Sequence, residues 1–309
     1  MAWGRKRRVA HHDWRRSASE EDLREYDAFG PWIYEIKAES DTPKRFRAAC
    51  AGHRDARFLL KAPRDIDRRD VRPGMDLYVA VLAVHDDGLS LMRLTDEGVV
   101  SQDVVWSQVA ALESHKDLLY SRWTLMLRDG GAFVLEYNTV SATLMGQVTD
   151  FVRSRWIRHD EPPRALASDS VVTVTDRYFR NVLTDQRGRG PQPVEPIHFE
   201  PAGRYCRDAN WLAFSTGVMF LDAPDELIIV NRDKPTRRFF EAVDAVSCVF
   251  IPYAGLTSFA LVRPPTARST RFHQLRLTLD NQVVQQSCLV EPVRVLARLA
   301  AYGVPQTSA

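Results

Sequence analysis

Two clusters of basic side chains are the residues of this sequence whose type and spacing best suit binding chemistry. The first cluster lies in the N-terminal arm, residues 1–18, where Asp13 is the one acidic residue among six cations: Arg5, Lys6, Arg7, Arg8, Arg15 and Arg16. Several cations on a polar, disordered segment can neutralise phosphates without a preformed pocket. We therefore treat the arm as a candidate site for an anionic membrane surface or a nucleic acid.

The second basic cluster lies inside the region that we expect to fold, at Lys61, Arg64, Arg68, Arg69 and Arg72. These groups could hold an anionic ligand, because arginine binds carboxylates and phosphates through two parallel hydrogen bonds. Three aspartates alternate with them and cancel much of their field: Asp65, Asp67 and Asp70. The alternation favours a surface whose charges pair with one another.

Signatures of metal sites and of catalysis are weak or missing in the sequence. The segments His11–Asp13 and His85–Asp87 contain metal-ligating residue types, but the first lies in the arm and the second in a tight turn, so we expect no native metal. The sequence has no nucleophile elbow, H-E-x-x-H pair, phosphate-binding loop or dinucleotide fingerprint. We expect no cofactor and no enzymatic activity; a hydrolase that uses scattered Asp, His and Ser residues is an alternative.

Charge and cysteine content narrow the class of protein further. The 309 residues carry 42 basic and 40 acidic side chains, a balance that gives the folded part no general attraction to nucleic acid. The four cysteines, Cys50, Cys206, Cys248 and Cys288, are far apart in sequence and form no C-x-x-C motif. No apolar run approaches the roughly 18 residues of a membrane helix. These features predict a cytoplasmic protein with buried, reduced thiols.

An approximate repeat organises the elements that must position these groups. Residues 123–137 alternate in polarity around the turn Asp129–Gly131, and helical spacing of apolar residues follows from Asn138 to Trp156. A second hairpin spans residues 275–284, and a second helix runs from Pro292 to Tyr302. Each hairpin therefore leads into an amphipathic helix.

The remaining elements are predicted from local patterns. Ser17 or Ser19 can cap a short helix through Leu23 and Tyr26, and residues 40–75 read as loop with short elements. A long loop rich in glycine and proline is expected at 186–196. Strands are expected at 77–84, 89–94, 171–174, 211–214, 218–221, 227–230, 239–246, 259–262 and 283–289.

These patterns predict a mostly β protein with some α-helix, built from two bent-sheet domains. The expected parts are a disordered arm over 1–18, a first β-domain with an N-terminal extension over 19–158, a linker over 159–170 and a second β-domain over 171–304. A C-terminal helix should close each domain.

This order of elements resembles that of bacterial proteins with tandem pleckstrin-homology-like domains. The resemblance rests on Tyr78–Tyr137 with the helix Asn138–Trp156, and on Trp211–Val290 with the helix Pro292–Tyr302. It implies two open barrels, each with a helix in one end. Some members bind phosphoinositides through a basic loop between their first two strands. The turn matched to that loop, His85–Gly88, is acidic, so we do not expect this ligand in the first domain.

The sequence as a whole predicts a non-catalytic binding or scaffolding protein. Its partner would be a protein or peptide, bound at an exposed sheet edge or in a groove between the domains. The alternative is a peripheral protein that binds an anionic membrane, or less plausibly a nucleic acid, through the N-terminal arm.

Overall fold

The computed structural model describes residues 15, 17–156, 171–189, 193–208, 211–232, 245–262 and 273–308. The fold is mostly β, with 41% strand and 28% helix, as the sequence predicts. The named strands pair in antiparallel fashion, one isolated bridge, Phe259↔Gln306, is parallel, and none of the sheets in the described residues closes into a barrel. The chain forms two compact units, Met1–Val104 and Val105–Ala309, which we describe separately.

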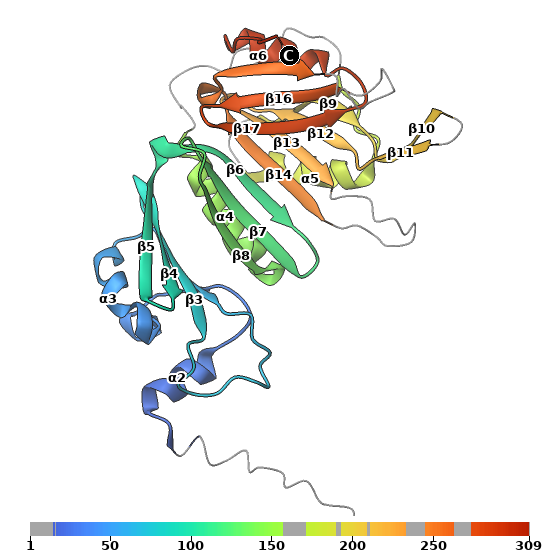
Figure 1. Ribbon diagram of the computed structural model, residues 1–309. Helices are drawn as coiled ribbons and strands as arrows, with labels where there is room; N and C mark the ends of the chain where they lie inside the picture. Colours follow the sequence, from blue (N-terminus) through green and yellow to red (C-terminus); the bar gives the residue numbers. More distant parts are fainter. Residues whose placement is uncertain are drawn as a thin grey trace, which may run out of the picture. The chain divides into compact units, whose positions relative to one another are not determined.

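The first unit is built around one sheet of five strands in sequence order, β1-β2-β3-β4-β5; Figure 1 labels β3, β4 and β5 of this sheet. Its longer elements are α2 (Glu20–Ala28), α3 (Arg47–Cys50), β1 (Tyr34–Glu35), β2 (Phe58–Pro63), β3 (Tyr78–Val84), β4 (Gly88–Thr95) and β5 (Gly98–Val105). The predicted N-terminal helix is confirmed as α2, and the Ser19 side chain caps it by accepting a hydrogen bond from the Asp22 amide. Phe46, Val71 and Val81 are fully buried in the core.

Strand β2 lies where the sequence predicted loop with short elements. The sequence analysis did not single out this strand, because Lys61 interrupts the apolar run, yet Lys61 is buried. Its ammonium group donates to the Asp41 carbonyl oxygen at 2.7 Å and lies 4.7 Å from the centre of the Tyr78 ring. Paired in this way, a lysine can occupy the inner face of a strand.

The second unit contains a sheet of seven strands in the order β8-β7-β6-β14-β13-β12-β9, a sheet of three, β15-β16-β17, and the hairpin β10-β11. Its strands are β6 (Val109–Lys116), β7 (Tyr120–Leu127), β8 (Ala132–Asn138), β9 (Glu195–Glu200), β10 (Gly203–Asp208), β11 (Trp211–Ser215), β12 (Val218–Asp222), β13 (Glu226–Arg232), β14 (Val246–Pro252), β15 (Ser258–Val262), β16 (His273–Leu279) and β17 (Gln282–Cys288). Its helices are α4 (Ala142–Arg153), α5 (Arg177–Arg189) and α6 (Val293–Ala301).

The second unit has layers on both faces of its large sheet. Phe220, Ile229 and Ile251 face a core shared with the three-stranded sheet and with Val295 and Leu299 of α6. Helices α4 and α5 cover β6 and β14 on the other face, where their side chains line one small cavity with Cys248 and Phe250. Residues 227–230 of β13 are fully buried, because both faces of that strand are covered.

Helix α5 was missed by the sequence analysis, which placed a strand at 171–174 and a loop at 186–196. The strand is wrong, because residues 171–176 have no regular structure. The loop is wrong at its ends, because the helix continues to Arg189 and β9 begins at Glu195, while residues 190–192 lie outside the described part of the chain. The buried stripe of α5 is narrow, consisting of Phe179, Leu183 and Gln186. A stripe that includes a glutamine gives little apolar periodicity.

The two predicted hairpins and the helices that follow them are confirmed. Strands β7 and β8 pair from Tyr120 to Asn138 and lead into α4, and β16 and β17 lead into α6. The first turn needs Gly130, whose φ of 97° is unfavourable for other residues. The strand expected at 239–246 lies mostly outside the described residues, and β14 begins at Val246.

The division of the chain falls earlier than the predicted linker. Residues 157–170, which include that linker, lie outside the described part of the chain. Strands β6 to β8, expected in the first domain, belong to the second compact unit because β6 pairs with β14 from Leu112↔Phe250 to Lys116↔Val246.

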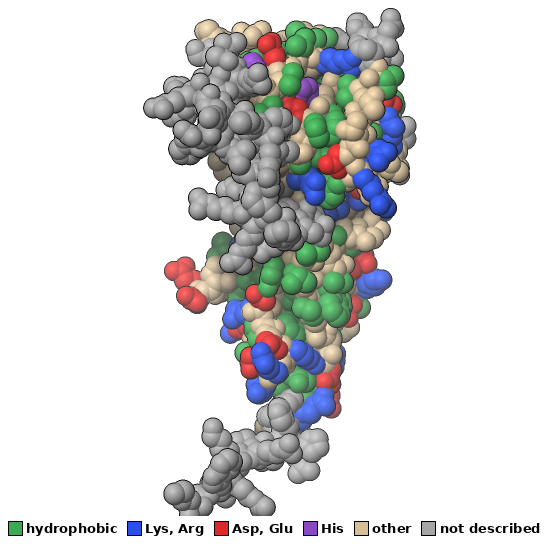
Figure 2. Space-filling view, turned by 90° about the vertical axis from the view of Figure 1, so that its right-hand side faces the viewer, with side chains coloured by type: hydrophobic (Ala, Val, Ile, Leu, Met, Phe, Trp, Pro, Cys, Tyr) green, Lys and Arg blue, Asp and Glu red, His purple; other side chains and the backbone are tan. Residues whose placement is uncertain are grey.

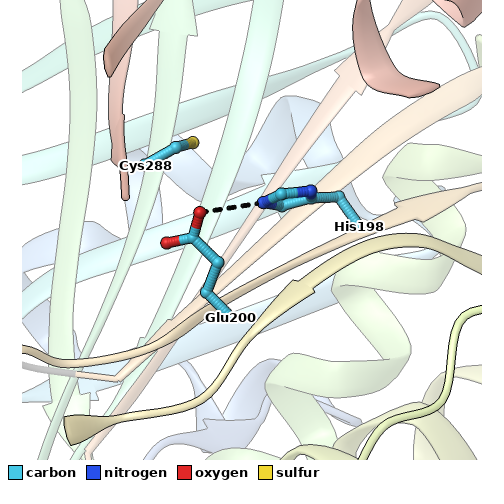
Figure 3. A group of neighbouring side chains, drawn as sticks. All are labelled: His198, Glu200 and Cys288. Carbon is cyan, nitrogen blue, oxygen red and sulfur yellow. Dashed lines mark hydrogen bonds and ion pairs between the residues drawn. The ribbon is translucent and has the colours of Figure 1, made fainter. Parts of the chain in front are cut away.

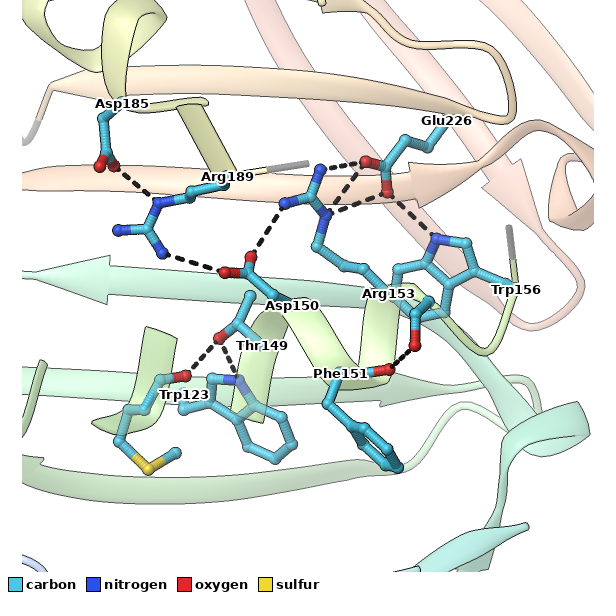
Figure 4. A network of polar contacts seen from close by, with 11 residues as sticks. Trp123, Thr149, Asp150, Phe151, Arg153, Trp156, Asp185, Arg189 and Glu226 are labelled. Carbon is cyan, nitrogen blue, oxygen red and sulfur yellow. Dashed lines mark hydrogen bonds and ion pairs between the residues drawn. The ribbon is translucent and has the colours of Figure 1, made fainter. Parts of the chain in front are cut away.

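A buried hydrogen bond fixes α4 to strand β7. The indole Nε1 of Trp123, a fully buried residue, donates to the Thr149 hydroxyl at 3.1 Å, and this hydroxyl donates to the Met145 carbonyl oxygen at 2.7 Å. Figure 4 shows this chain of contacts. The Thr149 hydroxyl is therefore both an acceptor and a donor at the buried contact between α4 and β7.

We expect Thr149→Val to lower the free energy of unfolding by about 1 to 3 kcal/mol, because the buried Trp123 N–H would lose its acceptor. Thr143→Val, at an exposed position of the same helix, should change it by less than about 0.5 kcal/mol. Urea unfolding followed by tryptophan fluorescence measures both. In a chain that already carries Trp123→Phe, Thr149→Val should change the free energy of unfolding only slightly, because the indole donor is gone. Equal effects of Thr149→Val and Thr143→Val in the otherwise unaltered chain would contradict the assignment.

Candidate functional site

His198, Glu200 and Cys288 form the one group of metal-ligating side chains found among the described residues. One ligand atom from each lies within 4.8 Å of the others, and the His198 Nε2 is 3.0 Å from a Glu200 carboxylate oxygen. Figure 3 shows the three side chains pointing toward one another. His198 and Glu200 come from β9, and Cys288 comes from the end of β17.

The hydrogen bonds of this group indicate a structural role. The Glu200 carboxylate accepts the backbone amides of Leu289 and Val290 at 2.8 to 2.9 Å, besides its contact with His198. Burial and the nearby Glu200 charge raise the pKa of the Cys288 thiol, so the thiolate that a metal needs is disfavoured. A metal ion would have to replace bonds that the carboxylate already makes. The residues therefore fit a structural contact that holds β9 to the end of β17, here called the Glu200 lock, better than a metal centre.

The predicted metal-ligating turn, His85–Asp87, has a different arrangement in the structure. His85 turns to His53, with 2.9 Å between His85 Nε2 and His53 Nδ1, while His85 Nδ1 lies 3.9 Å from an Asp55 oxygen. One imidazole nitrogen must donate and the other accept at such a distance. Sequence reasoning missed this pair because 32 residues separate the two histidines. The other candidate, His11–Asp13, lies outside the described residues.

Arg153 and Glu226 form a buried ion pair between α4 and the start of β13. The guanidinium of Arg153 donates to both Glu226 carboxylate oxygens, and the Trp156 indole donates to one of them at 3.1 Å. The Glu226 side chain is 1% exposed and the Arg153 side chain 10%. Burial without these partners would cost several kcal/mol per charge, so each group stabilises the other's presence in the core.

A second set of charges continues this network to α5, as Figure 4 shows. Asp150 lies 3.3 Å from Arg153 and 3.6 Å from Arg189, and Arg189 also contacts Asp185 at 2.9 Å. Burial raises the pKa of Asp150, opposed by the two arginines. All these charges have partners within the fold, so the network holds the two helices together.

The predicted basic cluster is divided between a strand and the long connection from β2 to β3. Lys61 is buried, and burial lowers its pKa. Arg68 donates to the Tyr26 carbonyl oxygen and lies over its ring, while Arg69 contacts Asp67 at 2.7 Å. Arg64 is exposed. Figure 2 shows basic and acidic side chains interspersed on the visible face.

The predicted site in the N-terminal arm lies almost wholly outside the described residues. Arg5, Lys6, Arg7, Arg8 and Arg16 are among those outside, and Arg15 is described. Arg15 forms an ion pair with Asp27 and lies 5.7 Å from the centre of the Tyr26 ring. The phosphate-binding role of the arm stays a prediction.

The described thiols are buried, as the sequence predicts. Cys50, Cys248 and Cys288 are free cysteines, and burial raises the pKa of Cys50 and of Cys248 to about 11. A thiol with such a pKa is almost wholly protonated at neutral pH and is a poor nucleophile.

One exposed apolar group was not anticipated from the sequence. Leu118, Leu119 and Tyr120 at the turn between β6 and β7, with Val140 beside them, are each 63% to 74% exposed. Two hydrogen bonds tie the turn to the start of the next segment: Thr139 donates through its amide to the Leu119 carbonyl oxygen and through its hydroxyl to that of Asp117. Polar groups of the turn are thus used internally, while its apolar side chains face outward.

In the part of the chain that the structure describes, no helix has the length and apolar character needed to cross a membrane. No protein-family model matches the sequence, and no curated protein matches it either. The function is therefore inferred from the geometry of the sites described above.

We expect Glu200→Gln to lower the free energy of unfolding by about 2 kcal/mol. The charge-assisted bonds to two backbone amides and to His198 would weaken, and one amide N–H₂ would have to face a backbone donor. Glu195→Gln on the same strand, which loses a half-exposed ion pair with Arg187, should cost less than about 1 kcal/mol. Chemical denaturation measures both; a Glu200 variant as stable as the Glu195 variant would argue against the lock.

Proposed function

We propose that this chain is a non-catalytic binding or scaffolding protein with two tandem pleckstrin-homology-like repeats. One observation carries the proposal: four antiparallel strands, three further strands and a helix follow one another twice, when the two-residue strand β1 at the edge of the first sheet is set aside. The first series consists of β2–β5, β6–β8 and α4. The second consists of β9 and β12–β14, then β15–β17 and α6, with the hairpin β10–β11 inserted after its first strand.

Contacts of the terminal helix support this interpretation of the second series. The Arg298 guanidinium of α6 donates to Asp222 at the end of β12, at 2.8 Å, and Tyr253 donates to the same carboxylate at 2.6 Å. Tyr302 stacks on Tyr253 with 3.9 Å between ring centres. The helix is therefore fastened to the end of the four-strand layer, as a helix that closes an open barrel would be.

The order of strands changes which loop of the first series is compared with the phosphoinositide loop. The first two strands of that series are β2 and β3, so the matching loop is 64–77; the acidic turn His85–Gly88 joins the second and third strands. This correction follows from β2, which the sequence analysis did not predict. Arg68, Arg69 and Arg72 direct guanidinium groups to acceptors inside that loop or in α2, which favours a structural role over phosphate binding.

The chemistry of the interior supports binding over catalysis. The clustered charges around Glu200, Arg153 and Asp222 make several hydrogen bonds within the fold, and the described thiols are protonated by burial. Neither arrangement combines an accessible nucleophile with a base in reach, which covalent catalysis requires. A binding or scaffolding role needs surfaces and edges instead.

Contacts between the two series suit a scaffold. Arg128, at the turn between β7 and β8, contacts Asp280 at the turn between β16 and β17, at 2.7 Å. Gln282 donates to the Gly131 carbonyl oxygen at 2.7 Å, so the corresponding turns of the two series lie against one another. Together with the pairing of β6 and β14, these contacts hold the parts of both series in the second unit in one orientation.

The proposal predicts a stoichiometric protein complex and no turnover. The full-length chain should capture a partner from cells that naturally contain it, and purified partner should bind the purified chain directly by calorimetry. A screen with hydrolase substrates is the counter-test. Reproducible turnover that a single His or Asp substitution abolishes would overturn the proposal in favour of an enzyme.

A second candidate function, peripheral binding to an anionic membrane, is favoured by the apolar turn at Leu118–Tyr120. Its exposed leucines could enter the outer part of a bilayer, with Tyr120 at the interface. The Asp117 carboxylate accepts the Leu118 amide at 2.6 Å, and the Asp117 amide donates to the Tyr120 carbonyl oxygen. These internal bonds reduce the cost of placing backbone groups near lipid.

If this second candidate holds, the double variant Leu118→Ser/Leu119→Ser should reduce binding to vesicles with anionic lipid by about tenfold, because two apolar side chains are lost from the contact. Val171→Ser, at a residue that is 89% exposed elsewhere in the unit, is the matched control and should bind as the unaltered chain does. Co-sedimentation measures both. Absence of binding by the unaltered chain would remove the candidate.

A further inference from the structure

The outer edge of β15 is occupied by the chain's own C-terminal segment. The Phe259 amide donates to the Pro305 carbonyl oxygen at 3.0 Å, and the Thr307 amide donates to the Phe259 carbonyl oxygen at 2.8 Å. Phe259 and Gln306 thereby form a parallel β-bridge. On its other side, β15 pairs with β16. The segment after α6 thus adds to the sheet as a short extra strand.

The corresponding edge in the first series also accepts a strand. If the two series correspond as proposed above, β6 is the counterpart of β15, because each begins the three-stranded part. β6 pairs with β7 on one side and with β14 on the other, over five residue pairs. The same edge therefore receives an added strand in both series, once from β14 and once from the C-terminal segment.

The C-terminal segment pairs with only one residue along the outer edge of β15. Both of its main-chain hydrogen bonds to β15, and the bond that the Thr307 hydroxyl donates at 3.4 Å, involve Phe259, although β15 extends to Val262. Because main-chain groups alternate along a strand, the N–H and C=O of Leu261 point the same way as those of Phe259. Beyond the bridge the edge is therefore long enough for a longer strand.

One side chain anchors the segment. Val304 is buried in the core beside α6, and its amide donates to the Leu299 carbonyl oxygen at 3.0 Å. Residues 305–308 are exposed. An apolar anchor followed by a few main-chain hydrogen bonds is the pattern by which extended peptides add to a sheet edge.

We propose that the edge of β15 is the site where this protein binds an extended segment of a partner protein, and that Val304–Thr307 is the intramolecular occupant that the partner displaces. The inference rests on the proposed binding function and names its surface. The partner segment would carry a small aliphatic residue at the Val304 position and a free amide N–H at the Thr307 position. Proline is acceptable at the Pro305 position, because only the carbonyl group is used there.

A competition experiment with the protein's own tail sequence tests the proposal. The probe is a fluorescent peptide with the sequence of residues 302–309, added to three full-length chains: the unaltered one, Thr307→Pro and Ser308→Pro. Thr307→Pro removes both the amide and the hydroxyl that donate to the Phe259 carbonyl oxygen, whereas the Ser308 amide takes part in none of these bonds. Thermal unfolding confirms that all three are folded.

We expect Thr307→Pro to bind the probe about tenfold more tightly than the other two chains, because an intramolecular competitor at high effective concentration has been weakened. Amide exchange at Phe259 and Leu261 should slow when the probe is added. No binding by Thr307→Pro, or equal binding by all three chains, would overturn the proposal. Dimers of the unaltered chain that Thr307→Pro abolishes would also overturn it, since the occupant would then be the tail of a second copy.

The same variants separate this proposal from the broader one. A captured partner that binds Thr307→Pro more tightly than Ser308→Pro would support both. A partner that binds the two variants equally would leave the binding function in place and overturn the assignment of the β15 edge. Turnover in the hydrolase screen, by contrast, would contradict the binding function whatever the probe does.

Discussion

The pairing of β6 with β14 is the contact on which the second compact unit depends. It joins two antiparallel segments, β6–β8 and β12–β14 with β9, into one sheet of seven strands. Helices α4 and α5 lie over this junction and cover it from one side. The ion pair between Arg153 and Glu226 then ties the helix of the first series to the second series. One edge-to-edge contact thus fixes the layers of the whole unit.

Buried charged side chains in this protein hold distant elements together. Arg153 with Glu226, Arg298 with Asp222, and Glu200 with two backbone amides each join elements that are distant in sequence. A buried pair contributes little net stability against an apolar alternative, yet loss of one partner costs about 3 to 5 kcal/mol. Such pairs therefore destabilise incorrect packing of these elements more than they stabilise the correct one.

Local patterns were sufficient to predict parts of this fold. The hairpins around Gly130 and Asn281 and the helices after them follow from polarity that alternates and then changes period. Strand β2 was hidden because Lys61 is buried by specific partners, and α5 because Gln186 belongs to its buried stripe. The Glu200 lock joins residues 89 positions apart, and no local signal encodes such a contact.

The proposed binding site follows from the hydrogen-bonding needs of edge strands. An edge strand presents main-chain donors and acceptors that favour pairing, so a stable protein covers the edge or uses it. The edge of β6 is covered by a full strand, which makes it part of the architecture. The edge of β15 has two main-chain hydrogen bonds to an exposed segment. β6 is thus paired along five residues and β15 at a single residue. The first edge is a fixed part of the fold, and the second is the one for which we propose that a partner competes.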